Sequence, residues 1–212
     1  MSAPAPRELP SLLAMSQFWN DRYRGDEYAY GREPNDFLRA EAHRIPPGRV
    51  LCVAEGEGRN AVHLAGLGHE VTMIDLSTEG LRKAERLARE RHVELRTVHA
   101  DLATYEPELD AFTGIVAIFA HLPPPVRKRV HAWIPRALTA GGVFILEAYT
   151  PQQLAFTTGG PRDPEMLMTL AGLREELAPL TVELGREVER EIHEGVHHGG
   201  PSATVQLVAV RR

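Results

Sequence analysis

Cysteine and lysine are almost absent from this chain of 212 residues. Cys52 is the only cysteine, which excludes an internal disulfide framework and a zinc site built from four cysteines. Lys83 and Lys128 are the only lysines, and neither follows a glycine, which excludes the Gly-x-x-x-x-Gly-Lys phosphate-binding loop. No apolar run is long enough to cross a bilayer, and no basic start precedes an apolar stretch. We therefore expect a cytoplasmic protein with no membrane partner.

Positive charge is also in deficit. The 24 Lys and Arg residues are outnumbered by 29 Asp and Glu residues, which argues against a nucleic-acid partner. Hydrophobic residues make up 43% of the chain, enough for a packed core in one domain. Three prolines interrupt the start of the chain, so we expect a flexible leader over residues 1–15 and a single domain over residues 16–212.

Short apolar runs alternate with helical patterns through the middle of the chain. Asn35 is expected to cap a helix that ends near residue 44, and Ser77 to cap another. From residue 181, two alternating stretches meet at a turn over residues 195–201, as in an antiparallel hairpin. The expected strands cover residues 50–54, 70–75, 93–98, 114–120 and 143–149. This order predicts an α/β fold, a doubly wound, Rossmann-like and mostly parallel sheet with an antiparallel hairpin at the C-terminus.

A glycine turn follows the first expected strand. It reads Gly56-x-Gly58-x-x-Ala61, and Asp75 ends the second strand. This spacing matches the dinucleotide-binding fingerprint, in which glycines let the ligand approach the backbone and the acidic residue binds the ribose hydroxyls. The pattern indicates a ligand that contains adenosine.

The charges of the turn discriminate between adenosine ligands. Glu55 and Glu57 flank Gly56, so a pyrophosphate at this helix N-terminus would meet two carboxylates. S-adenosylmethionine has no phosphate and carries a sulfonium and an ammonium cation. The turn therefore favours S-adenosylmethionine over NAD as the cofactor.

Four segments resemble class I S-adenosylmethionine-dependent methyltransferases, nearest to the tellurite-resistance-type and thiopurine-type branch. They are residues 18–23 (FWNDRY), the glycine turn running into Arg59 and Asn60, residues 99–102 (HADL), and the pair Gly141 and Gly142. Two positions depart from the family: Cys52 replaces an acidic residue and Ala54 replaces a glycine.

The resemblance implies a seven-stranded sheet whose last strand runs antiparallel. It also implies a helical lid over residues 16–44, a cofactor-binding core over residues 49–150, and a C-terminal part of the sheet over residues 151–212. The expected cofactor-binding residues are Trp19, Tyr23, Tyr30, Glu55, Gly56, Gly58, Asn60, Asp75, Leu76, Ala100, Asp101, Leu102 and Phe119.

His121 is the candidate catalytic residue. It follows the fourth expected strand, at the sheet edge where open α/β folds bind ligands. With an ordinary pKa near 6.5, a histidine there can take a proton from a thiol or hydroxyl acceptor. The alternative is that His121 caps the strand or the next helix. The resemblance favours a small-molecule acceptor, such as a thiol or a reduced metalloid oxyanion, and it implies no metal.

Two other functions compete with methyl transfer. A nicotinamide-dependent oxidoreductase of the short-chain type needs Tyr-x-x-x-Lys, but Glu79 and Pro124 stand four positions before the two lysines. A non-catalytic domain that binds an adenosine ligand is the other alternative, and measured turnover would distinguish it from an enzyme.

The tail contains a His-Glu-x-x-His sequence from His193 to His197. On a helix this signature binds zinc in metalloproteases. Here Gly195 interrupts it and residues 199–201 (GGP) follow it, which favours a strand and a turn. We expect exposed hairpin histidines rather than a zinc hydrolase.

Overall fold

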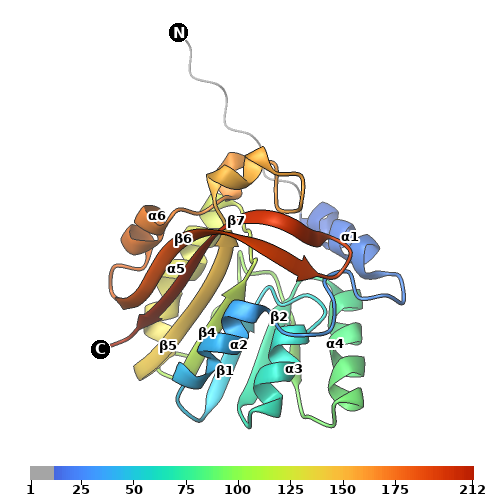
Figure 1. Ribbon diagram of the computed structural model, residues 1–212. Helices are drawn as coiled ribbons and strands as arrows, with labels where there is room; N and C mark the ends of the chain where they lie inside the picture. Colours follow the sequence, from blue (N-terminus) through green and yellow to red (C-terminus); the bar gives the residue numbers. More distant parts are fainter. Residues whose placement is uncertain (1–11) are drawn as a thin grey trace.

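The computed structural model describes residues 12–212 and contains one seven-stranded sheet (Figure 1). The strand order is β3-β2-β1-β4-β5-β7-β6. Neighbouring strands from β3 to β5 are parallel, whereas β7 is antiparallel to both β5 and β6. The expected α/β fold with an antiparallel C-terminal hairpin is confirmed. No helix within residues 12–212 is long and apolar enough to cross a membrane.

The strands are β1 (Arg49–Val53), β2 (Glu70–Asp75), β3 (Arg96–His99), β4 (Phe112–Ile118), β5 (Leu138–Tyr149), β6 (Thr181–Glu194) and β7 (His198–Val210). The α-helices are α1 (Leu12–Tyr23), α2 (Asp36–Glu41), α3 (Arg59–Gly66), α4 (Thr78–Glu90), α5 (Pro124–Ala137) and α6 (Leu170–Glu176). Three short 3₁₀ helices are η1 (Ala42–Arg44), η2 (Pro151–Ala155) and η3 (Pro164–Met166).

The sheet separates two hydrophobic cores. Along β1, Leu51 and Val53 face the core formed with α5 and α6, whereas Val50 and Cys52 face the core formed with α2, α3 and α4. Successive side chains of a strand point to opposite faces, so a run that is apolar at every position is buried on both sides. Figure 1 shows these helices on the two sides of the sheet.

Both predicted helix caps are confirmed. The Asn35 side chain accepts the N–H of Leu38 at the start of α2, and the Ser77 hydroxyl accepts the N–H of Gly80 at the start of α4. These contacts satisfy backbone groups that lack a partner within the helix.

Three boundaries differ from the expectation. Helix α1 begins at Leu12, so residues 12–15 belong to it rather than to the leader, and residues 1–11 lie outside the described part. Strand β3 begins at Arg96, because Val93 donates to Ala88 and closes the end of α4. The hairpin turns between Glu194 and His198, so the GGP segment lies in β7.

The hairpin extends beyond the sheet. Pairing of β5 with β7 stops at Tyr149 and Thr204, whereas β6 and β7 remain paired up to Glu194 and His198. In Figure 1 this red hairpin passes over the upper end of the sheet toward α1. At its tip, the N–H of Val196 donates to the carbonyl of Ala29 at 3.1 Å. The tip therefore rests on the segment that follows α1.

Candidate functional site

Two neighbouring strands end in strained residues. Strands β1 and β4 are adjacent, but the chain continues from them to opposite sides of the sheet, which is the point where open α/β sheets bind ligands. Ala54 follows β1 with φ of 51°, and Phe119 follows β4 with φ of 53°. Left-handed backbone is unfavourable for residues other than glycine and clusters at functional sites. The strain marks this edge as the candidate site.

The glycine turn is packed against protein on two sides. Gly56 and Gly58 have φ values of 65° and 85°. A Cβ atom on Gly58 would lie 2.4 Å from the Cβ of Ala84, and one on Gly56 would lie 2.7 Å from the Tyr23 hydroxyl. Gly58 therefore permits close packing of α4, and Gly56 permits the approach of Tyr23.

Asp75 has the geometry expected of a residue that binds the hydroxyls of a ribose. Its buried carboxylate accepts the N–H of Gly56 at 2.7 Å and the N–H of Ser77 at 2.8 Å, one on each oxygen. A carboxylate oxygen has about two acceptor positions, so one position on each oxygen is left for a hydroxyl. Burial raises the pKa of Asp75, and the backbone N–H groups of Ser77, Gly56 and Leu76 oppose this effect.

The expected adenine-binding residues lie beside Asp75. Ala100 donates its N–H to the Asp75 carbonyl at 3.2 Å, and Leu76 directly follows Asp75. Asp101 accepts the N–H of Ala103 at 2.9 Å, which forms a tight turn, and the Leu102 side chain is buried against the core. The ends of β2 and β3 thus form one polar and apolar surface suited to an adenosine.

The glutamates of the turn make hydrogen bonds and an ion pair within the protein. Glu55 Oε1 accepts the N–H groups of Asn60 and Ala61 and so caps α3. Glu57 Oε1 lies 2.5 Å from Nζ of Lys83, and both side chains are buried. Unpaired N–H groups at a helix start attract a carboxylate. Both carboxylates thus have partners within the protein, and their attraction for the cofactor stays a prediction.

Asn60 also has an internal role. Its N–H donates to Glu55, and its side-chain oxygen accepts the N–H of Asn35 at 2.9 Å. It therefore connects the glycine turn to the start of α2, and its contact with the cofactor stays a prediction. The sequence indicated its position in the turn but not the direction of its side chain.

Aromatic rings connect the turn to the end of β4. Trp19 stacks on Tyr23 with ring centres 5.6 Å apart, and Tyr23 lies 6.3 Å from Tyr30. Tyr30 lies 4.5 Å from His198, which in turn lies 4.8 Å from Phe119. The structure thus brings the four expected rings together. Two further rings belong to this group: His198 and Tyr149, whose ring centre lies 4.7 Å from that of Phe119. Nothing in the sequence indicated a role for His198.

His121 joins two strand ends and is not available as a base. Its Nε2 accepts the N–H of Tyr149 at 2.9 Å, and its Nδ1 lies 3.0 Å from the carbonyl of Phe119, to which it donates. Burial lowers the pKa of His121 to about 3, so the ring is neutral. Both ring nitrogens are used, and the strand-capping alternative therefore describes His121, whereas the catalytic assignment does not.

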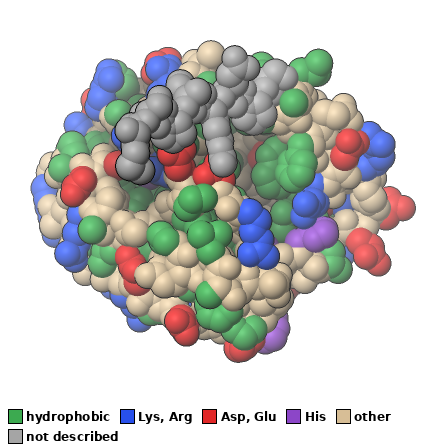
Figure 2. Space-filling view, turned by 90° about the horizontal axis from the view of Figure 1, so that it is seen from above, with side chains coloured by type: hydrophobic (Ala, Val, Ile, Leu, Met, Phe, Trp, Pro, Cys, Tyr) green, Lys and Arg blue, Asp and Glu red, His purple; other side chains and the backbone are tan. Residues whose placement is uncertain are grey.

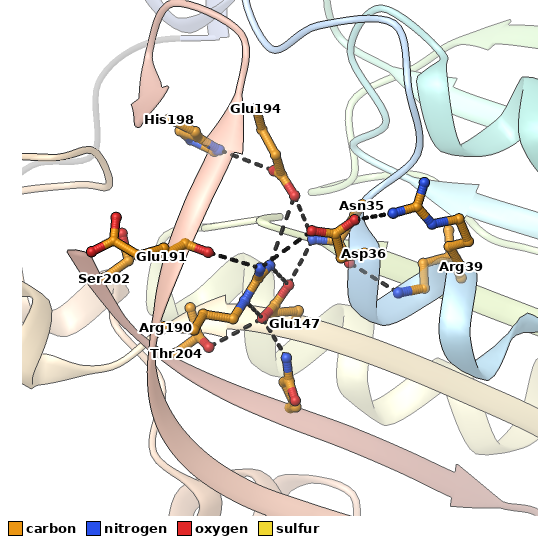
Figure 3. A network of polar contacts seen from close by, with 12 residues as sticks. Asn35, Asp36, Arg39, Glu147, Arg190, Glu191, Glu194, His198, Ser202 and Thr204 are labelled. Atoms are coloured by element: carbon orange, nitrogen blue, oxygen red, sulfur yellow. Dashed lines mark hydrogen bonds and ion pairs between the residues drawn. The ribbon is translucent and has the colours of Figure 1, made fainter. Parts of the chain in front are cut away.

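A buried polar network holds the hairpin to the sheet (Figure 3). Glu147 of β5 is fully buried and receives two hydrogen bonds from Arg190 of β6, at 2.9 and 2.8 Å. Asn35 donates to Glu147 at 2.6 Å and to Glu194 at 2.8 Å. Glu194 also pairs with Arg59 at 2.6 Å. The network orients Glu194 at the tip of the hairpin.

The His-Glu-x-x-His sequence lies on the hairpin, as expected from its glycine. His193 and His197 are exposed, whereas Glu194 is buried in the network. Among the described residues, no group of three or more His, Cys, Asp or Glu side chains could hold a metal ion.

Comparison with known proteins agrees with the class of protein that the fold and the glycine turn indicate. Residues 50–142 match the methyltransferase domain family. Residues 50–142 are thus similar to a methyltransferase domain, and methyltransferases of this fold use S-adenosylmethionine. No curated protein matches the chain.

Solved structures share the fold. One, titled as the conversion of a disulfide bond into a thioacetal group during echinomycin biosynthesis, is 20% identical with a TM-score of 0.76 and aligns over 93% of this chain and 91% of its own. A methyltransferase from Methanosarcina mazei is 18% identical with a TM-score of 0.67, over 84% and 98%. TehB from Haemophilus influenzae is 17% identical with a TM-score of 0.63, over 93% and 67%.

Proposed function

We propose that this protein transfers the methyl group of S-adenosylmethionine to a small-molecule acceptor, as enzymes similar to the tellurite-resistance-type and thiopurine-type branch do. The observation that carries the proposal is the Asp75 carboxylate, which two backbone N–H groups hold at the strand end with one acceptor position left on each oxygen. That arrangement suits the two ribose hydroxyls of the cofactor.

The other residues of the site have distinct roles in this proposal. Ala100, Asp101 and Leu102 hold the adenine, next to Asp75. Tyr23, Tyr30 and Phe119 surround the methyl end, where ring faces attract a cation by about 0.5–2 kcal/mol and exclude water. When bound, S-adenosylmethionine supplies an electrophilic methyl group, so the chain itself mainly aligns the reactants.

A thiol or a reduced metalloid oxyanion is the preferred acceptor. The solved structure whose title describes the conversion of a disulfide bond into a thioacetal supports sulfur chemistry on this fold. Figure 2 supports a small molecule over a nucleic acid, because charged side chains of both signs are interspersed on the face it shows. A nucleic-acid site would need a basic stripe.

Isothermal titration with S-adenosylhomocysteine and with NAD tests the cofactor. We expect S-adenosylhomocysteine to bind at micromolar concentration and NAD to bind more weakly. Asp75→Ala should weaken S-adenosylhomocysteine at least tenfold with an unchanged circular dichroism spectrum, because charge-assisted hydrogen bonds contribute about 1.5–3 kcal/mol each. Asp26→Ala, at an exposed position before Tyr30, is the matched control. Tighter binding of NAD, or unchanged affinity in Asp75→Ala, would refute the assignment.

A further inference from the structure

His198 occupies a central position that the proposed function leaves unexplained. It is the first residue of β7, and its side chain is buried under the hairpin tip. Its ring lies 4.5 Å from Tyr30, 4.8 Å from Phe119 and 5.5 Å from Tyr149, measured between ring centres. Phe119 follows the strand next to the glycine turn, and Tyr30 contacts Tyr23 above that turn. His198 therefore lies beside the space where a bound methyl group would be.

Glu194 lies on the other side of the His198 ring. Nδ1 of His198 is 3.6 Å from Oε2 of Glu194, an ion-pair distance longer than a hydrogen bond. Glu194 is held by Arg59 and Asn35, so its carboxylate cannot turn away. Within residues 12–212, Nδ1 of His198 has no hydrogen-bond partner, and no hydrogen bond to its Nε2 is found. An imidazole with one nitrogen toward a fixed carboxylate and the other unused is the arrangement of a general base.

The surroundings of His198 keep the ring neutral until it takes a proton. Burial lowers the pKa of His198, and the negative charge of Glu194 opposes this effect. The charged or titratable groups around it come from six parts of the fold: Glu194 of β6, Arg59 of α3, His197 of the turn, Tyr30 after α1, Tyr149 at the end of β5 and His121 at the end of β4. A neutral imidazole is the form that accepts a proton.

We propose that His198 is the base that deprotonates the methyl acceptor, that Glu194 positions it, and that the acceptor is a neutral thiol on an apolar or aromatic molecule. This inference rests on the proposed methyl transfer. In the step, the acceptor S–H proton goes to Nε2 of His198, the sulfur lone pair forms the S–CH₃ bond, and the methyl–sulfonium bond breaks. The products are the methylated thioether, S-adenosylhomocysteine and the imidazolium of His198.

The acceptor class follows from the same residues. An oxyanion already carries the electron pair that attacks the methyl group and needs no base, whereas a neutral thiol must lose its proton. Tyr30, Phe119 and Tyr149 present rings around His198, and such rings contribute large apolar contact area. A surface hollow of about 240 Å³ is lined by Tyr30, Arg59 and Glu194, so it borders the carboxylate of the pair, whereas His198 does not line it.

Two thiols of different acidity test the base. Phenylmethanethiol is neutral at pH 7, whereas 4-nitrothiophenol is largely ionised, and formation of S-adenosylhomocysteine measures transfer to each. His198→Gln should slow transfer to phenylmethanethiol at least 100-fold, the size of a general-base effect, and transfer to 4-nitrothiophenol less than threefold. His197→Gln changes the adjacent, exposed histidine and should leave both rates within threefold. Equal losses with both thiols would overturn the base assignment, and transfer to neither by the unmodified protein would overturn the acceptor class.

A second measurement does not depend on activity. NMR titration of the His198 ring should show a lower pKa in Glu194→Gln than in the unmodified protein, and no change in Glu191→Gln, which alters an exposed neighbour on β6. An unchanged pKa in a folded Glu194→Gln protein would overturn the pairing. If Glu194→Gln does not fold, the His198→Gln comparison decides alone. Failure of the unmodified protein to bind S-adenosylhomocysteine would instead refute the proposed function, so the two failures are distinguishable.

Discussion

Glu55 offers a direct test of how the glycine turn is built. The resemblance to methyltransferases places Glu55 at the cofactor, whereas its carboxylate caps α3. Burial raises the pKa of Glu55 from 4.5 to about 7, although the α3 N–H groups and Arg59 oppose the shift. Glu55→Gln keeps an oxygen for the α3 N–H groups and removes the titration. The variant therefore separates the charge of Glu55 from its hydrogen bonds.

The size of the expected stability change follows from the pKa of Glu55 in the unfolded chain and in the folded protein. The folded protein holds a proton on Glu55 more tightly than the unfolded chain does, so stability falls as the pH rises from 4.5 to about 7. The full cost of the buried charge, about 3 kcal/mol, is present above that range and absent below pH 4.5. Relative to the unmodified protein, Glu55→Gln should therefore gain about 2–3 kcal/mol between pH 5 and pH 8.

Urea denaturation at pH 5, 6, 7 and 8 measures this difference. Comparing the two proteins at each pH cancels the titration of all other groups. Glu189→Gln, at an exposed position of β6, is the control and should show no pH-dependent difference. Affinity for S-adenosylhomocysteine should change less than threefold in Glu55→Gln, because the side chain faces α3. A stability difference that does not change with pH would refute the raised pKa of Glu55. A tenfold loss of affinity for S-adenosylhomocysteine would show that Glu55 faces the cofactor.

Three further predictions concern the turn, the strand ends and the tail. Gly58→Ala should lower the free energy of unfolding by about 2 kcal/mol or more in urea, because its Cβ meets Ala84 at 2.4 Å; Gly141→Ala, equally left-handed but with open space, should lose less. His121→Ala should lower the free energy of unfolding by about 1–3 kcal/mol at pH 8. Below pH 6.5 the unmodified protein should lose further stability, because its His121, with a pKa of about 3, stays neutral while the unfolded chain binds a proton, and His121→Ala should lose less. Equal acid sensitivity of the two proteins would contradict this. Metal analysis of the purified protein should find no stoichiometric zinc, and one zinc per chain would contradict the hairpin assignment of His193.

The sequence could predict features that depend on neighbours along the chain. Asn35 and Ser77 cap helices because their side chains reach N–H groups three residues later. The strands of the parallel sheet are recognisable because burial on both faces makes them apolar at every position. Asp75 was predictable as well, since the length of one strand–helix–strand unit sets its distance from the glycine turn.

Partners distant in sequence could not be predicted in this way. Lys83 is fully buried against Glu57, and nothing near either residue indicates that α4 brings them within 2.5 Å. Glu147 looks like an interruption of an apolar strand until Arg190, 43 positions later, pairs with it. Charges in the glycine turn could not be assigned to a ligand or to the protein without these contacts.

The hairpin explains why one sequence motif suggests two different sites. On a helix, His193 and His197 would share a face, as zinc binding requires. On β6 the side chains alternate, so Ile192 and Glu194 are buried while His193 is exposed. The short turn then returns the chain at His198, directly opposite Glu194 in the ladder. Because β6 and β7 extend beyond β5, this Glu–His pair lies over the strand ends instead of beside the sheet. The strand period of two thus separates the two histidines of the motif and brings a carboxylate and an imidazole together at the hairpin tip.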